Sequence, residues 1–271
     1  MNKFYPKNIH EMIKASVDIW HKGWCEGNGG NISLKAQNDI IEFYHVNESD
    51  TSGNWIALTE SYPELADTFF IISGSGRFLR NIELFPEKNI GLIKLNGKGS
   101  HYMKIWGFEG NTKPTSELPA HLSIHAVRKK ISHGHDKVVI HVHPPNLIAL
   151  SYIEELTSEK LSKIIWKMHA EGIVVFPEGI GFLPWLMAGS KEIAVRSQEL
   201  FKQHRIILWE HHGVLASGRN LDEAFGLIHT AEKLAEIYIK CISAGGIKKE
   251  LSSRQLGLIA RNFNVKPAYK L

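Results

Sequence analysis

The chain has 271 residues, of which 43% are hydrophobic and 22% are charged. These shares are ordinary for a globular protein and exclude intrinsic disorder and the fibrous classes. Lys and Arg (32) exceed Asp and Glu (28) by only four, so the sequence predicts no nucleic-acid partner, although a small anionic substrate remains open.

No segment indicates export or membrane insertion. The first ten residues include Lys3, Pro6 and Lys7 but no apolar run, and a stretch of about 18 apolar residues is absent. We therefore expect a cytoplasmic protein that does not enter a membrane. Cys25 and Cys241 lie far apart and form no Cys-x-x-Cys motif, so both are expected to be plain thiols.

The first third predicts one helix followed by strands. Asn8 and Glu11 have the spacing of a capping box, which predicts that a helix begins there. Its expected apolar face comprises Ile9, Ile13, Val17, Trp20 and Trp24. A glycine-rich loop over 26–31 then leads into a strand over 32–34, and the polar segment 37–67 is expected to be irregular.

Three further strands are predicted before residue 110. Phe69–Ile72 is a compact apolar run that ends in a second glycine-rich turn, Ser73–Gly76. The runs Ile90–Leu95 and Tyr102–Trp106 flank Asn96-Gly97-Lys98-Gly99, whose residues tolerate positive φ. These two runs therefore predict an antiparallel hairpin.

The middle of the chain alternates helices with apolar runs. We expect a helix from Ser116 to about Lys130, followed by a polar break at His133–Asp136. A strand over Val138–His143 comes next and is stopped by Pro144-Pro145. Short helices from Asn146 and around 161–168 then precede a strand over Ile173–Phe176.

The last third predicts a helix over Ser190–His204, a strand over Arg205–Trp209 and a strand over Val214–Ala216. Asn220 and Glu223 have capping-box spacing before a long apolar stripe that ends at Gly245-Gly246. The stripe comprises Ala224, Ile228, Ala231, Ala235, Tyr238 and Ile242. Without repeats or linkers, the pattern favours one α/β domain over 1–271, with a mixed sheet covered by helices.

Three histidines could form a metal site. Side chains alternate along a strand, so His141 and His143 project to one side about 7 Å apart, close enough to share an ion. His212 ends another apolar strand before a glycine, which permits a tight backbone turn. Three imidazoles suit Zn²⁺ and leave the open fourth position of a catalytic site.

Other readings of these histidines remain open. Histidines at strand ends are also satisfied by ordinary hydrogen bonds, and His211 is a direct rival of His212. His133 and His135 form a second His-x-His pair, but Gly134 and Asp136 place it in a polar loop, where we expect it to be solvated.

Three turns could hold an anion. Glu117 follows Pro114-Thr115-Ser116 at a predicted helix start, where backbone N–H groups lack helical partners. Alternatively, Glu117 only complements the helix dipole, which stabilises a helix by about 0.3–1 kcal/mol. The loops around Gly30 and Gly76 could likewise form phosphate cradles, although neither is a P-loop because no Gly-Lys-Ser/Thr follows.

Taken together and in order, these motifs resemble the class II sugar-phosphate aldolases. The motifs are Gly29-Gly30-Asn31, Ser73–Gly76, Thr115–His121, His141-Val142-His143 and His212-Gly213. One branch of that family is most similar, in chain length, in the Trp20-x-x-x-Trp24 pair and in the phrase Val174–Pro177. The resemblance implies a three-layer α/β/α domain with a mostly antiparallel central sheet, assembled as a homotetramer with sites at subunit interfaces.

The resemblance also implies roles for the matched residues. His141, His143 and His212 match the zinc ligands, and His212 is preferred to His211 because the family's ligand directly precedes glycine. Glu117 matches the catalytic carboxylate. The residues that match the substrate-phosphate site are Asn28, Gly30, Asn31, Ser75, Gly76, Thr115 and Ser116. Glu171 resembles a glutamate that one branch supplies near the aldehyde from a neighbouring subunit.

The implied reaction is retro-aldol cleavage of a phosphorylated ketose into dihydroxyacetone phosphate and an aldehyde. Zn²⁺ on the ketone and hydroxyl oxygens would stabilise the enediolate, while Glu117 moves the proton. Epimerases and dehydratases share the three-histidine pattern and remain alternatives. Non-catalytic binding modules on this scaffold lose the metal-binding histidines, and all three are present here.

Overall fold

The computed structural model describes residues 5–36, 38–44 and 54–271. The expectations for residues 1–4, 37 and 45–53 fall outside this part. The rest of the polar segment 37–67 is not wholly irregular, which corrects the sequence expectation. It contains α2 (Asn38–Phe43), β2 (Trp55–Ala57) and the 3₁₀ turn η1 (Pro63–Leu65).

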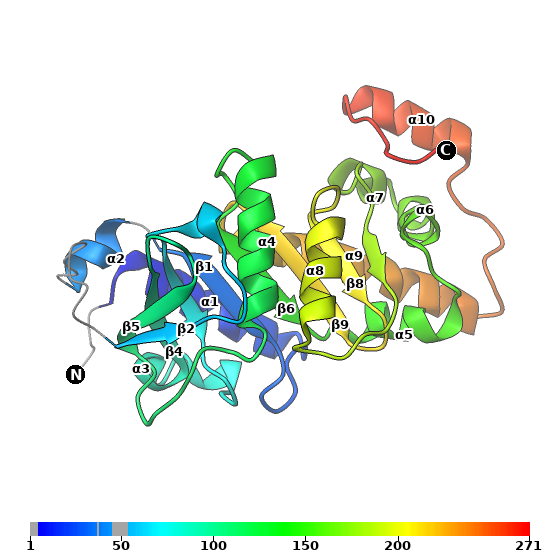
Figure 1. The fold of residues 1–271 in the computed structure, drawn as a ribbon. Helices are drawn as coiled ribbons and strands as arrows, with labels where there is room; N and C mark the ends of the chain where they lie inside the picture. Colours follow the sequence, from blue (N-terminus) through cyan, green and yellow to red (C-terminus); the bar gives the residue numbers. More distant parts are fainter. Residues whose placement is uncertain (1–4, 37, 45–53) are drawn as a thin grey trace.

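A nine-stranded sheet runs through the molecule in the order β2-β5-β4-β3-β1-β6-β9-β8-β7 (Figure 1). Its other strands are β1 (Asn31–Lys35), β3 (Phe69–Ser73), β4 (Ile90–Leu95), β5 (His101–Gly107), β6 (Val138–Val142), β7 (Gly181–Leu183), β8 (Ile206–Trp209) and β9 (Gly213–Gly218). Every neighbouring pair in this sheet is antiparallel except β7 with β8. The expected mixed, mostly antiparallel sheet is therefore confirmed.

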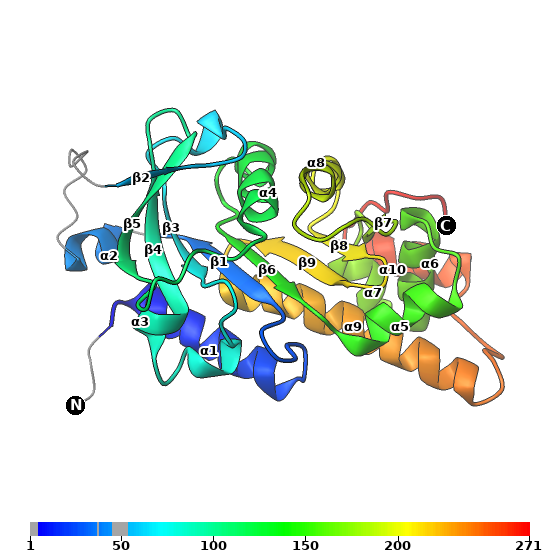
Figure 2. The same ribbon diagram turned by 60° about the horizontal axis from the view of Figure 1, so that its bottom comes forward.

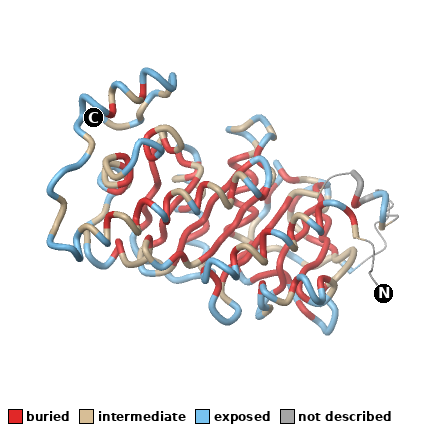
Figure 3. Tube along the Cα trace, turned by 180° about the vertical axis from the view of Figure 1, so that it is seen from behind, coloured by how far each residue is buried: buried red, intermediate tan, exposed pale blue. Residues whose placement is uncertain are grey.

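Helices cover both faces of this sheet (Figure 2). One face carries α1 (Lys7–His21), α5 (Pro145–Ile153), α6 (Ser158–Met168) and the long α9 (Leu221–Ser243), while the other carries α4 (Leu118–Ile131) and α8 (Lys191–Leu200). Figure 3 shows that burial is concentrated in the strands between these layers. The three-layer α/β/α architecture expected from the sequence is confirmed.

Alternation along β6 decides which layer each of its residues faces. Val138, Ile140 and Val142 belong to the large core that also contains residues of α1 and α9. Val139 instead packs in the core shared with α4 and α8. His141 has the parity of Val139, so its ring lies on the α4 side of the sheet.

The hairpin between β4 and β5 is confirmed, with Leu95 opposite Tyr102. Gly99 in its turn has φ +63°, and a Cβ at this position would lie 2.1 Å from the backbone oxygen of Tyr62. Any other residue would therefore displace the neighbouring chain.

Two details of the first helix differ from expectation. It begins at Lys7 after Pro6, and no side chain caps it, so the capping box expected at Asn8 is wrong. Proline is well suited to a helix start, because its φ is already near the helical value. The expected face is also shifted, since Trp20 is 40% exposed and Trp24 lies beyond the helix end.

The strand expected over Ile173–Phe176 is wrong, because Ala170–Val175 forms helix α7. His169 starts this helix by accepting a hydrogen bond from the Glu171 N–H at 3.2 Å. Ile173 then packs against Trp166 of α6 in a small core that includes residues of α10 (Ser253–Asn262). A short apolar run fits either a strand or a buried helix, and the packing partner decided between them.

The long helix α9 is confirmed, but its start has only half of the expected capping box. Asn220 Oδ1 accepts from the Glu223 N–H at 2.8 Å, whereas the Glu223 carboxylate accepts from Arg219. A complete box forms at Ser252 and Gln255, before α10. Cys25 and Cys241 are free thiols. Among the described helices, none has the length and apolarity needed to span a membrane.

Candidate active site

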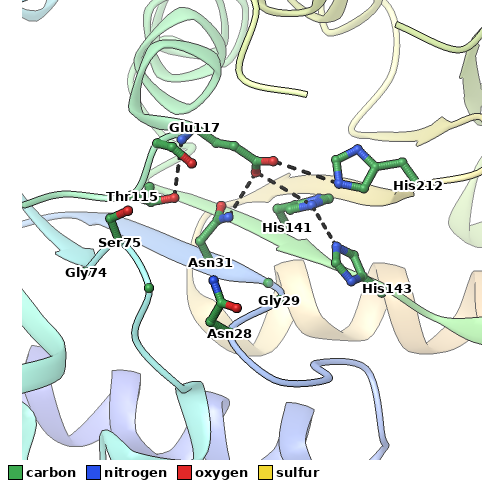
Figure 4. A pocket seen from close by; sticks show the side chains of 13 residues that line it. Asn28, Gly29, Asn31, Gly74, Ser75, Thr115, Glu117, His141, His143 and His212 are labelled. Atoms are coloured by element: carbon green, nitrogen blue, oxygen red, sulfur yellow. Dashed lines mark hydrogen bonds and ion pairs between the residues drawn. The ribbon is translucent and has the colours of Figure 1, made fainter. Parts of the chain in front are cut away.

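Three histidines meet in one pocket on the α4 side of the sheet (Figure 4). His141 lies in β6, His143 directly follows that strand, and His212 lies in the turn from β8 to β9. Their ring centroids are 4.9 to 5.3 Å apart. One nitrogen of each ring lies within 4.8 Å of the other two, a spacing that fits a single bound ion.

His141 and His143, at the end of β6, are oriented through their Nδ1 atoms. His141 Nδ1–H donates to the backbone oxygen of Val214 at 3.1 Å, and His143 Nδ1–H donates to Glu26 Oε1 at 2.7 Å. Both partners only accept, so each ring presents an Nε2 lone pair to the pocket. These Nε2 atoms are 3.2 Å apart and repel each other unless a proton or metal ion lies between them. The donor set therefore fits a metal ion.

Burial favours the neutral form of the His141 and His212 rings. It lowers the pKa of His141 well below its usual value, and the nearby His143 and His212 lower it further. Burial is also the main cause of the lowered pKa of His212, which the Glu117 carboxylate partly opposes. The neutral imidazole is the form that binds metal ions.

The competing histidines lie outside this cluster. His211 occupies the left-handed turn position with φ 56° and stacks on Tyr152, with ring centroids 4.0 Å apart. His133 and His135 are exposed in the loop after α4, as expected. His212 is therefore the histidine that the fold brings to His141.

Gly213 has a different role from the one expected. Its φ is not positive, so it does not make the tight turn. A Cβ at Gly213 would lie 2.8 Å from His143 Cδ2 and 3.0 Å from His141 Cε1. Gly29 is constrained in the same way, because a Cβ there would lie 2.9 Å from His143 Cε1. Both glycines leave room for the imidazoles.

Glu117 reaches the pocket from the start of α4. It is 7% exposed, and its Oε2 and Oε1 lie 3.6 Å from His141 Nε2 and 3.9 Å from His212 Nε2, respectively. Asn31 Nδ2–H donates to Oε2 at 2.9 Å. The Glu117 side chain makes no capping hydrogen bond at the start of α4. Its carboxylate faces the histidines (Figure 4).

The three glycine- and hydroxyl-rich turns surround the same pocket. Every expected phosphate-site residue lines it, namely Asn28, Gly30, Asn31, Ser75, Gly76, Thr115 and Ser116. A bridge between Gly74 and Pro114 holds the second and third turns side by side. Four N–H groups of the turns already donate to carbonyl oxygens of the chain, those of Gly29, Gly74, Ser75 and Thr115. An anion would therefore be held by other N–H groups and by hydroxyls.

Glu171 does not line this pocket. It is exposed in the first turn of α7, at the end of the molecule where α6 and α10 also lie (Figure 1). Within one chain, the structure therefore does not bring Glu171 to the three histidines.

Four residues near the site carried no expected role. Glu26 orients His143 through the hydrogen bond described above. Burial alone would raise the pKa of Glu26, but hydrogen bonds from its own backbone and from His143 hold this pKa below its usual value. The other three are Ser33, His121 and His125, which lie behind Asn31. For His121 and His125, the sequence signal was their i, i+4 spacing from Glu117, which places them on the helix face below it, whereas Ser33 on β1 had no such signal.

Comparisons with known proteins agree with this geometry. Residues 10–239 match the family described as Class II Aldolase and Adducin N-terminal domain. The rhamnulose-1-phosphate aldolase of Yersinia pestis (strain Pestoides F) is 44% identical over 259 residues, which cover 96% of this chain and 94% of that enzyme.

Solved structures show the same likeness. A sugar-phosphate aldolase from Thermotoga maritima is 31% identical with a TM-score of 0.71, and the match covers 89% of this chain and 97% of that one. The L-fuculose-1-phosphate aldolase from Thermus thermophilus is 20% identical with a TM-score of 0.57, covering 89% and 98%, and shares the fold.

The first prediction separates the two adjacent histidines. His212→Ala should lose most of the bound metal, because it removes one of three converging nitrogens. His211→Ala should retain metal, because its ring stacks on Tyr152 instead. The metal content of both purified variants measures this. Loss of metal from His211→Ala but not from His212→Ala would show that the assignment is wrong.

The second prediction concerns Glu26. Glu26→Ala should weaken metal affinity by about 10-fold, the low end for a residue that orients a ligand, because its side chain is 73% exposed. Competition with a chelator gives the affinity. Glu210→Ala is the matched control, since this carboxylate accepts from the Trp185 N–H and contacts none of the three histidines. Unchanged affinity in Glu26→Ala would contradict an orienting role.

Proposed function

The chain belongs to the class II aldolase and adducin N-terminal family, and we propose that it cleaves L-rhamnulose 1-phosphate into dihydroxyacetone phosphate and L-lactaldehyde. It is an aldolase, a carbon–carbon lyase. The observation that carries the proposal is one pocket in which three histidines, a carboxylate and three turns suited to binding an anion meet. The substrate is the one named for the Yersinia pestis relative, which matches this chain over nearly its whole length.

The proposed metal is Zn²⁺, held by His141, His143 and His212. Nitrogen donors favour zinc, and three of them leave a coordination position for substrate. When bound, zinc supplies Lewis acidity that stabilises the negative charge of an enediolate. His141 is buried at the end of β6, and the hydrogen bonds of His141 and His143 through Nδ1 fix the orientation of these two rings.

Glu117 is the proposed acid/base. Its Oε2 is engaged by Asn31 Nδ2–H, which leaves Oε1 as the oxygen free to take or return a proton. In cleavage, the hydroxyl whose oxygen becomes the aldehyde loses its proton, and the electrons of the broken carbon–carbon bond pass into the enediolate. A proton returned to the carbon beside the ketone then completes dihydroxyacetone phosphate. No lysine Schiff base is needed for this sequence. A positioned base of this kind typically contributes about 10²–10⁴-fold to the rate.

The three turns are proposed to hold the substrate phosphate. Because several of their amides are engaged within the chain, we assign the phosphate to the N–H groups of Gly76 and Ser116 and to nearby hydroxyls, including that of Ser75. Asn28, Gly30 and Thr115 line the same pocket. Binding at this remote group positions the reacting carbons between the histidines and Glu117.

The assembly is also part of the proposal. A homotetramer would let a neighbouring subunit place its own Glu171 at the aldehyde end of the pocket, and the exposure of Glu171 on α7 is compatible with this. The proposal also includes a single domain over residues 1–271. It places the protein in the cytoplasm, where phosphorylated sugars are metabolised. Nucleic acid and membranes are not expected partners.

The third prediction tests the reaction itself. Protein loaded with about one zinc per chain should release dihydroxyacetone phosphate from L-rhamnulose 1-phosphate, and a chelator should stop the release. Enzymatic measurement of triose phosphate, with product identification, gives the outcome. An epimerase would yield only another ketose phosphate, and a binding module would yield no product. Equal rates on unphosphorylated L-rhamnulose would contradict the phosphate site.

The fourth prediction concerns Glu117→Gln. The amide keeps the shape of the side chain but cannot accept the proton, so kcat should fall by about 10²–10⁴-fold. Zinc should be retained, because the three histidines are unchanged. A modest weakening of zinc affinity is allowed, since Glu117 lies close to two of them. Near-normal cleavage by a zinc-loaded Glu117→Gln enzyme would falsify the acid/base role.

A further inference from the structure

A row of buried polar side chains runs from Glu117 into the space between the sheet and α4. After Asn31 come His121, Ser33 and His125. His121 is fully buried, Ser33 is 1% exposed and His125 is 4% exposed. His121 Nε2 is hydrogen-bonded to Asn31 Oδ1, and Ser33 Oγ lies 2.6 Å from His121 Nδ1 and 2.8 Å from His125 Nε2. The mechanism assigned above uses none of these three residues.

The chemistry of each group fixes the direction of every hydrogen bond in the row. The Asn31 amide turns its NH₂ group toward Glu117 Oε2, which accepts at 2.9 Å. The Asn31 carbonyl oxygen then faces His121 Nε2, which must carry a proton to donate.

The same logic continues outward from His121. Burial lowers the pKa of His121 to about 3, so the ring is neutral and Nδ1 is unprotonated. The Ser33 hydroxyl therefore donates to His121 Nδ1, and its oxygen accepts from His125 Nε2–H. Burial likewise lowers the pKa of His125 well below its usual value. All four donors thus point toward the Glu117 carboxylate.

We propose that His121, Ser33 and His125 form a positioning network that holds the Asn31 amide in one orientation and thereby keeps Glu117 Oε1 free for the proton. Without His121, the Asn31 amide could rotate and present its oxygen to the carboxylate, which would repel Glu117 and displace it. None of the three residues touches substrate in this proposal. The hydrogen-bond network does not depend on the proposed function; only its expected effect on kcat rests on that function.

Simple core filling does not account for this row. Burying two imidazoles and a hydroxyl is unfavourable unless their hydrogen bonds are satisfied, and apolar side chains of similar size would fill the same space without that cost. In this row, the direction of each hydrogen bond sets the direction of the next, and the row ends at Glu117, the proposed acid/base. The ring of Phe70, 4.7 Å from that of His125, packs beside its outer end.

The fifth prediction uses Ser33→Ala, which breaks the row with the smallest change in volume. In the zinc-loaded enzyme, kcat on L-rhamnulose 1-phosphate should fall by about 10–100-fold, since a displacement of about 1 Å can cost 10²-fold. KM and zinc content should change little, because Ser33 is not in the pocket. The matched control is Ser16→Ala, which removes an equally buried hydroxyl that donates to the Ile13 backbone oxygen, and this variant should leave kcat unchanged.

A double-mutant cycle distinguishes positioning from general damage. If the network acts through Glu117, Ser33→Ala should cost nothing further in a Glu117→Gln background. Equal losses in both backgrounds would overturn the proposal. Should Ser33→Ala not fold, His125→Leu cuts the row one bond farther out, and its kcat loss should vanish in the same way.

A second readout does not depend on activity. Nitrogen NMR of ¹⁵N-histidine-labelled, zinc-loaded protein, assigned with His121→Gln and His125→Gln, should show both rings protonated on Nε2. A proton on Nδ1 of His121 would overturn the network even in an active enzyme. If the tautomers are as expected but L-rhamnulose 1-phosphate is not cleaved, the network stands and the proposed function fails.

Discussion

The register between β1 and β6 is the constraint on which the whole site depends. Asn31 lies opposite His141, and Ser33 lies opposite Val139. A slip of one residue would turn the side chains of one strand to the other face of the sheet, because strand residues alternate. Asn31 and Ser33 would then face α1 and α9 instead of α4. The register is held by β1, in which Ile32 and Leu34 alternate with these two polar residues and are buried in the core beside α1 and α9.

Glu117 is placed by a different element, so the site is built at the meeting of two layers. The bridge between Gly74 and Pro114 fixes the chain just before α4, and Thr115 Oγ1 accepts from the Glu117 N–H at 3.3 Å. The Glu117 carboxylate is thereby held against His141 and Asn31 without acting as a helix cap. A buried carboxylate is unfavourable unless donors or a cation surround it, and this pocket supplies donors through Asn31.

Close packing around the histidines explains why glycine occupies two neighbouring positions. A Cβ at Gly213 would meet the Val142 backbone oxygen and the rings of His143 and His141, and a Cβ at Gly29 would meet the Glu26 backbone oxygen and the His143 ring. Glycine next to His212 therefore belongs to the packing of the site rather than to its turn, which His211 makes with a left-handed backbone. A glycine in a motif can therefore be required for the space that its missing Cβ leaves to neighbouring atoms, rather than for its backbone conformation.

Much of the architecture was readable from local pattern. Continuous β-branched runs predicted β6 and β8, alternation put His141 and His143 on one side, and the apolar stripe predicted α9, because these periods depend only on neighbouring residues. The order of the motifs indicated the family, and with it His212 and Glu117. The pairings of distant segments required the tertiary structure. Ile173–Phe176 had no local feature to separate a strand from a helix, and contact with Trp166 decided it. Glu26 acquires its role only because the fold brings it to His143, and Ser33 acquires its role because the fold brings it to His121 and His125. A hydrogen bond is set by distance and direction in space, and residues more than 80 positions apart carry no periodic signal that records it.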